Sequence, residues 1–236
     1  MSMFTAPKSD AQAAVDPAID PAPILPSAAS AQPNQQPSSL VAKSRSDDLG
    51  PVILPLVALA APHFTTAEIL TPPSHCPPSA VVLSSPHAGR VYPAEFIAAS
   101  IADVSALRGL EDFAVDQLIG SVRDHGITCI NNQISRAYID VNRPVDALDN
   151  AMFTSPPTAA NTAAASSRHV RAGYGLLPRL TAAREVIHRQ LLPLDEVESR
   201  IALVHKPYHQ AVQAALATAH SHFGRSLLID CHSMPS

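Results

Sequence analysis

The chain has 236 residues, of which 46% are hydrophobic and 4% aromatic, and it carries a formal net charge of −4. This length fits one domain with or without a tail, and the charge excludes a basic surface for nucleic acid or an anionic membrane. The three cysteines, Cys76, Cys129 and Cys231, are widely spaced, which excludes a disulfide framework or a C-x-x-C zinc clip and fits a reducing compartment.

Nothing in the sequence predicts a membrane segment or a secretion signal. The most apolar stretch, residues 52–61, is far shorter than the roughly 20 residues of a spanning helix, and Pro55 interrupts it. The N-terminus lacks a cationic region followed by an apolar one. We therefore expect a cytoplasmic protein that works without a membrane.

The first third of the chain is rich in proline, and more than half of the 23 prolines precede residue 80. Residues 1–48 consist mainly of small and polar residues, which bury too little apolar surface to offset the entropy of ordering, so we predict a disordered tail. Residues 49–79 are a transitional segment of short apolar pieces broken by prolines. We expect extended chain and turns there, with room for one edge strand.

The composition changes at Ala80, after which apolar runs alternate with helical patterns. Apolar, β-branched runs predict four short strands, at residues 80–85, 127–130, 137–141 and 226–231. Helical spacing predicts three helices, at residues 111–126, 182–193 and 194–224. Gly126 is a suitable C-cap for the first of them, and Pro193 and Pro207 are expected to break or kink the other two.

The segment 154–167 is of low complexity, and we expect a loop there. On either side of it, helices and short apolar strands alternate along the chain. This alternation indicates a layered α/β domain over residues 80–236. Periodicity alone predicts no particular strand order.

Polar side chains follow three of the predicted strands, in SSPHAGR (84–90), SRAYIDVNRP (135–144) and IDCHSMPS (229–236). In open α/β sheets, functional groups collect just beyond the carboxyl ends of the strands. His87 and His232 each stand at such an exit. The sequence therefore predicts a site where these three segments meet.

The residue types in these segments point to hydrolytic zinc chemistry. Zinc takes imidazole and carboxylate ligands, and a catalytic site keeps one position open for water. His87 and His232 supply two nitrogens, and a carboxylate within 111–116 supplies the third ligand. Asn142 and Arg143 offer adjacent donors, and an arginine fork suits a substrate carboxylate. Together these groups predict cleavage of an amide in a small acidic molecule.

Five motifs resemble those of one known family: SSPHAGRVYP, LEDF, SRAYIDVNRP, KPYH and LIDCHSMPS, in this order over residues 80–236. They are similar to motifs of the N-formylglutamate amidohydrolase (N-formylglutamate deformylase) family. The resemblance implies a three-layer α/β/α phosphorylase/hydrolase-like fold with a mixed sheet, akin to the zinc carboxypeptidases and aspartoacylase. It also implies zinc-dependent hydrolysis of N-formyl-L-glutamate, or a related N-acyl amino acid, to the free amino acid and formate, a step of histidine breakdown.

The resemblance also implies roles for particular residues. His87 and His232 match the expected zinc-binding histidines. Related carboxypeptidases have a glutamate ligand three residues after the first histidine, where this chain has Arg90. Asp112, in LEDF, matches the acid of the family at that helix start and is expected to be the third ligand. Three other carboxylates compete with it for this role: Glu95, Glu111 and Asp116.

The resemblance further implies a set of substrate-binding residues. Arg136, Asn142 and Arg143 match residues that hold the substrate carboxylates, and we expect Asp140 to orient their loop. For Tyr208 and His209 two interpretations stay open: they line the pocket, or they are a packing residue and a solvated histidine. Five other histidines are expected to face solvent: His125, His188, His205, His220 and His222.

Nucleophilic catalysis by serine or cysteine is disfavoured. Ser84 and Ser85 lack the Gly-x-Ser-x-Gly elbow of serine hydrolases. Cys231 is flanked by strand residues and is expected to be a small buried apolar side chain. Metal-assisted hydrolysis is therefore the preferred interpretation.

The resemblance also implies residues beyond this chain. Chains of the family continue well past Asp-x-His-Ser, and the carboxypeptidase-like enzymes place their general-base glutamate in that continuation. No residue of this sequence matches that glutamate, so we expect a C-terminally truncated domain. Two hypotheses follow: a zinc-dependent amidohydrolase that a longer chain or a partner completes, or a catalytically incomplete homologue that at most binds metal or ligand.

Overall fold

A computed structural model of the protein describes residues 49–155 and 164–233. The disordered tail predicted for 1–48 and the centre of the loop predicted for 154–167 lie outside these residues. Among the helices of the described segments, none has the length and apolarity needed to span a bilayer.

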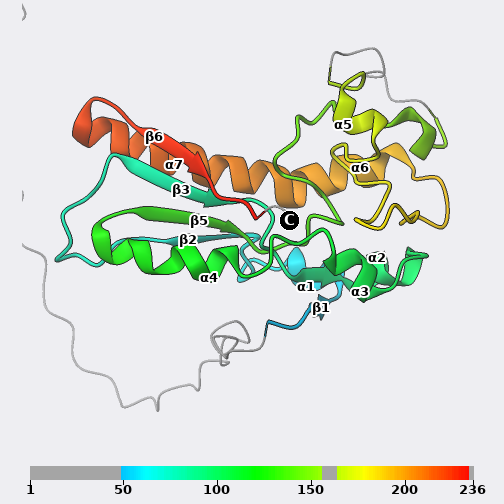
Figure 1. The fold of residues 1–236 in the computed structure, drawn as a ribbon, viewed down its shortest axis with the longest axis horizontal. Coiled ribbons are helices and arrows are strands. Elements are labelled where there is room, and N and C mark those ends of the chain that lie inside the picture. Colours follow the sequence, from blue (N-terminus) through cyan, green and yellow to red (C-terminus); the bar gives the residue numbers. More distant parts are fainter. Residues whose placement is uncertain (1–48, 156–163, 234–236) are drawn as a thin grey trace, which may run out of the picture. The chain divides into compact units, whose positions relative to one another are not determined.

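The core of the fold is a four-stranded mixed sheet with the strand order β2-β5-β3-β6 (Figure 1). Three of its strands are parallel: β3 (Val81–Ser85), β5 (Thr128–Asn132) and β6 (Leu227–Asp230). The edge strand β2 (Ala67–Leu70) runs antiparallel to β5. Three of the four predicted strands are thus confirmed, and their parallel order brings their carboxyl ends to one edge of the sheet.

Helices cover both faces of this sheet. Helix α7 (Lys206–Phe223) packs on one face and α4 (Val115–Gly120) on the other (Figure 1). A sheet buried on both faces requires continuous apolar runs rather than alternation, which explains the sequence of β3. The three-layer α/β/α architecture with a mixed sheet is therefore confirmed.

The helix predicted for 194–224 is confirmed as one continuous helical stretch. It consists of α6 (Leu194–Arg200), a π-helical turn η4 (Ile201–His205) and α7. Pro207 does not break it and lies in the first turn of α7, immediately after the π-helical turn η4. Proline has no backbone N–H, so Pro207 cannot donate to the Leu203 carbonyl four residues earlier. This carbonyl instead accepts a hydrogen bond from Thr66 Oγ1 (3.3 Å).

Smaller elements surround the sheet. In the segment 49–79, β2 is an edge strand as expected, but two further elements precede it. Strand β1 (Val52–Leu54) pairs in parallel with β4 (Val91–Pro93), and α1 (Leu56–Leu59) follows β1. The remaining elements are α2 (Ala94–Ala99), α3 (Val104–Arg108), η1 (Ser121–His125), η2 (Asn150–Met152) and α5 (Arg168–Arg171).

The helix predicted for 182–193 is wrong, because this segment forms turns. The Thr181 amide donates to the Glu185 carbonyl (2.9 Å), and Leu180 and Val186 form an antiparallel bridge around it. Arg184 at the turn has a positive φ of 69°, a conformation that is incompatible with a right-handed α-helix.

The strand predicted for 137–141 is also wrong. Its apolar residues are fully buried, but the Tyr138 amide donates back to the Ser135 carbonyl (3.0 Å) and the Asp140 amide to Leu176 (2.8 Å). The segment is therefore a buried turn. The helix predicted for 111–126 is shorter than expected: α4 begins at Val115, η1 continues it, and Gly126 (φ 80°) ends it as predicted.

Candidate metal and substrate site

His87 lies in the loop that follows β3. Its side chain is 3% exposed, and the loop is pinned where Gly89 passes the chain after β5. A Cβ on Gly89 would lie 2.3 Å from the Ile134 carbonyl oxygen, so the close approach requires glycine. The sheet and this contact together fix where the imidazole lies.

Asp112 and His232 meet His87 at the carboxyl edge of the sheet. Asp112 lies in the turn before α4, and its amide donates to the His87 carbonyl (3.0 Å). Its Oδ2 atom is 2.8 Å from Nδ1 of His232, which follows β6, and 3.5 Å from Nδ1 of His87. One ligand atom of each residue lies within 4.8 Å of the others.

This donor set fits a divalent metal ion. The Nδ1 atom of His87 is buried and has no hydrogen-bond partner among the residues that the structure describes, which is rare for a buried polar atom. Two imidazoles and one carboxylate are a ligand set that zinc accepts. The structure thus brings together the three side chains that the sequence proposed as ligands.

The competing carboxylates have other partners. Glu95 accepts from the Leu56 amide (2.9 Å). Asp116 pairs with Arg90 (3.1 Å), the residue that stands where carboxypeptidases have their glutamate. Glu111 accepts hydrogen bonds from the hydroxyl of Tyr92 and from Arg108 Nε. None of the three contacts either histidine of the site in the described part of the chain.

Asp140 connects the candidate metal ligand His87 with Arg136, Asn142 and Arg143. Its Oδ1 accepts from His87 Nε2 (2.7 Å) and from the Asn142 amide (2.9 Å). Its Oδ2 accepts from Arg136 Nε (2.9 Å), with Arg143 Nε 3.7 Å away. The carboxylate is fully buried, so these partners compensate its desolvation.

The electrostatics follow from these contacts. Burial opposes the ionised form of Asp140, but His87 and the arginines outweigh it and lower the pKa to about 2. Burial also raises the pKa of Asp112, yet His87 and His232 reverse this and the pKa is lowered. For His87, burial lowers the pKa, but Asp112 and Asp140 outweigh it and the pKa is raised. The site therefore holds two ionised carboxylates around one buried imidazole.

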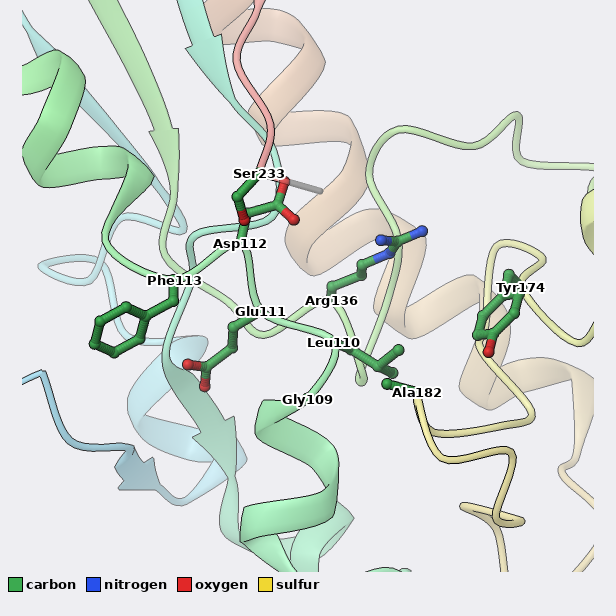
Figure 2. A pocket seen from close by; sticks show the side chains of 9 residues that line it. All are labelled: Gly109, Leu110, Glu111, Asp112, Phe113, Arg136, Tyr174, Ala182 and Ser233. Carbon is green, nitrogen blue, oxygen red and sulfur yellow. The ribbon is translucent and has the colours of Figure 1, made fainter. Parts of the chain in front are cut away.

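A pocket of about 440 Å³ opens beside Asp112. Figure 2 shows the Arg136 side chain between Asp112 and Tyr174, with Ser233 beside Asp112. The terminal nitrogens of Arg136 make no hydrogen bond to any described residue, since only its Nε is used for Asp140. The remaining lining residues are Gly109, Leu110, Glu111, Phe113 and Ala182.

Asn142 and Arg143 are not among the residues that line this pocket, but they contact residues around it. Asn142 Nδ2 is 3.1 Å from His232 Nε2. Arg143 donates from Nε to the Tyr174 carbonyl (3.2 Å), and its Nη2 lies 3.5 Å from His169 Nδ1. Tyr174 and His169 were not anticipated from the sequence. The glycines on either side of Tyr174 are typical of a turn, and Gly173 does adopt a positive φ of 91°.

Tyr208 and His209 are not among the residues that line the pocket. Tyr208 is 3% exposed and donates from its hydroxyl to Ser84 Oγ (2.9 Å), which in turn donates to Asp230. His209 contacts the Val141 carbonyl (2.8 Å). Both residues hold neighbouring elements in place.

The fold and this site define the class of the protein: a three-layer α/β protein with a candidate divalent-metal site at the carboxyl ends of its strands. Residues 79–236 match the family model described as N-formylglutamate amidohydrolase. The chain therefore belongs to the N-formylglutamate amidohydrolase family, as its five motifs predicted.

Two relatives support this assignment. An N-formylglutamate deformylase of Pseudomonas putida is 26% identical over 158 residues, which are 66% of this chain and 52% of that protein. The crystal structure of an N-formylglutamate amidohydrolase from Ralstonia eutropha JMP134 superposes with a TM-score of 0.66 at 33% identity. That match covers 73% of this chain and 59% of the other. The chain thus spans little more than half the length of the relatives it matches.

Proposed function

We propose that this chain carries the metal-binding and substrate-binding groups of an enzyme that hydrolyses the formyl amide of N-formyl-L-glutamate, or of a related N-acyl amino acid, to the free amino acid and formate. The observation that carries the proposal is the meeting of His87, Asp112 and His232 beside a pocket that contains Arg136. Family membership and the names of both relatives support the substrate. We further propose that the reaction serves histidine breakdown in the cytoplasm.

The proposed metal is one zinc ion held by His87, Asp112 and His232. When bound, zinc supplies a Lewis acid and an acidified water for amide hydrolysis. Asp140 fixes the His87 ring by accepting its Nε2 hydrogen, which leaves Nδ1 directed toward Asp112. Such outer carboxylates orient a ligating imidazole and raise its basicity.

The proposed substrate-binding groups are the guanidinium of Arg136 and the Asn142–Arg143 dipeptide. N-formyl-L-glutamate has two carboxylates, and arginine binds carboxylates with paired hydrogen bonds. Arg136 lines the same pocket as Asp112, and its terminal nitrogens make no hydrogen bond to any described residue. A carboxylate held there would bring the rest of a small substrate to the metal site.

A second candidate function is binding of metal and acidic ligand without turnover. Hydrolysis gains roughly 10²–10⁴-fold from a positioned general base. The pocket-lining carboxylates in the described part are Glu111 and Asp112, and both are engaged by neighbouring side chains. This engagement favours binding over catalysis by the described residues alone.

One experiment separates the two functions. The purified chain is loaded with zinc, and formate release from N-formyl-L-glutamate is measured together with zinc content. Stoichiometric zinc with formate release supports the enzyme, and stoichiometric zinc without formate supports the binding function. His87→Ala, Asp112→Ala and His232→Ala should each lose zinc, whereas His222→Ala, an exposed position on α7, should retain it. Circular dichroism establishes that each variant is folded.

A further inference from the structure

Two histidines of the helical stretch that contains η4 and α7 contact the loop that follows Asp140. His205 ends η4 and His209 lies one turn later in α7. Their ring centroids are 4.3 Å apart, and His205 is buried, contrary to the expected exposure. Both rings therefore lie on the face of the helix that packs on the protein.

Each ring makes a hydrogen bond to one backbone carbonyl of the segment 141–143, which contains Asn142 and Arg143. His205 Nε2 lies 2.9 Å from the Arg143 carbonyl oxygen, and His209 Nε2 lies 2.8 Å from that of Val141. A carbonyl only accepts, so both Nε2 atoms must donate. The two hydrogen bonds are placed on either side of Asn142.

Asn142 is also fixed through its own groups. Its amide donates to Asp140 Oδ1 (2.9 Å), and its side-chain Nδ2 is 3.1 Å from His232 Nε2. The backbone is thus held by Asp140 within the same turn and by two histidines from the helical stretch of η4 and α7. Any shift at Val141 or Arg143 would move the Asn142 side chain relative to His232.

The local helix geometry and the charge of His205 fit this role. π-helical turns are rare and are frequent at functional sites, and η4 ends at His205 itself. Burial lowers the pKa of His205. The ring is therefore neutral near pH 7, and its single proton sits on the nitrogen that faces Arg143.

We propose that His205 and His209 are positioning residues that fix the Asn142–Arg143 dipeptide for binding of the substrate carboxylate. The inference rests on the proposed function for the identity of the ligand. Each histidine contacts this segment at a backbone carbonyl, so both act through the backbone. A residue that only filled space would need no donor at Nε2.

The test compares alanine with glutamine at each position, because glutamine keeps an NH donor at the end of its side chain. Two quantities are measured on the zinc-loaded chain: hydrogen–deuterium exchange of the peptide covering 139–145, and the Kd for N-formyl-L-glutamate by calorimetry. His220→Ala, exposed on the same helix, is the matched control. Zinc content is measured for every variant.

We expect His205→Ala and His209→Ala to exchange faster in 139–145 and to raise the Kd about 3- to 10-fold, the loss of one neutral hydrogen bond. The glutamine variants should recover both values, with zinc content unchanged throughout. Unchanged exchange in the alanine variants overturns the inference, as does glutamine behaving like alanine. If the unmodified chain does not bind N-formyl-L-glutamate, the proposed function fails, and the exchange rates still decide the positioning role.

Discussion

Asp140 accepts a 2.7 Å hydrogen bond from the Nε2 atom of His87, and both side chains are buried. This contact sets which nitrogen of the imidazole is free to bind a metal. The same carboxylate binds Arg136 and the Asn142 amide. One buried charge therefore connects the candidate metal ligands with the groups proposed to bind substrate.

Asp140→Asn should lower the affinity for zinc about 10- to 100-fold, the usual effect of losing a partner behind a ligating histidine. Asparagine has nearly the same shape but carries no charge to hold the Nε2 hydrogen and two guanidinium groups. Competition with a chromophoric chelator measures the affinity. Asp149→Asn is the matched control, because Asp149 pairs with Arg179 (2.9 Å) outside the site. Equal losses in both variants would contradict a specific role for Asp140.

Gly89→Ala should destabilise the fold and weaken zinc binding together. The added Cβ would meet backbone atoms of Gln133 and Ile134 at 2.3 to 2.6 Å, and backbone cannot move aside cheaply. The loop that carries His87 would have to shift. We expect a loss of about 2 kcal/mol or more in the free energy of unfolding, measured by urea denaturation.

The control for this substitution is Gly120→Ala at the end of α4. Its Cβ would meet nothing nearer than Leu70 Cδ1 at 4.0 Å, and its backbone is helical (φ −62°, ψ −30°). Alanine there should be neutral or stabilising by up to about 1 kcal/mol. A similar loss of stability at both glycines would refute the close-approach argument.

The features that the sequence predicts correctly are those encoded by short stretches of neighbouring residues. Continuous apolar runs identified β3, β5 and β6, and the polar residues at the ends of parallel strands had to converge. This rule predicted that His87 and His232 lie close together, although they are 145 residues apart in the sequence. Asp112 followed from the family resemblance and not from its spacing, because it lies in a turn.

The parts that could not be predicted depend on tertiary contacts. Residues 137–141 look like a strand, yet the Leu176 carbonyl takes the Asp140 amide and the segment turns. The pattern of 182–193 suits a helix, yet Thr181 and Glu185 close a turn instead. His205 shows the same limit, because only the fold brings the Arg143 carbonyl to its ring.

Arg200→Ala should destabilise the protein by about 2 to 4 kcal/mol. The side chain is 1% exposed, donates from Nη1 to the Tyr138 carbonyl (2.7 Å) and lies over the Tyr138 ring at 4.2 Å. Its loss leaves a cavity and an unpaired buried carbonyl. Arg225→Ala, at an exposed position, should change the free energy of unfolding by less than about 0.5 kcal/mol. Urea denaturation of both variants gives the comparison.

Acid should destabilise the fold partly through His188. Burial, followed by the nearby charge of Arg200, lowers its pKa to about 4, whereas the pKa in the unfolded chain is about 6.5. Between these values the unfolded chain binds a proton that the folded chain does not. The stability from neutral His188 is thus complete above pH 6.5 and is lost as the pH falls toward 4.

The lowered pKa of His188 should reduce the free energy of unfolding by at most about 2 kcal/mol between pH 7 and pH 5. His188→Gln keeps a donor for the Pro178 carbonyl, which His188 contacts at 3.1 Å, but does not titrate. Urea midpoints at the two pH values should therefore differ less in this variant than in the unmodified chain. His222→Gln, at an exposed position of α7, should keep the full pH dependence. An identical pH slope in His188→Gln and the unmodified chain would show that His188 does not titrate on unfolding.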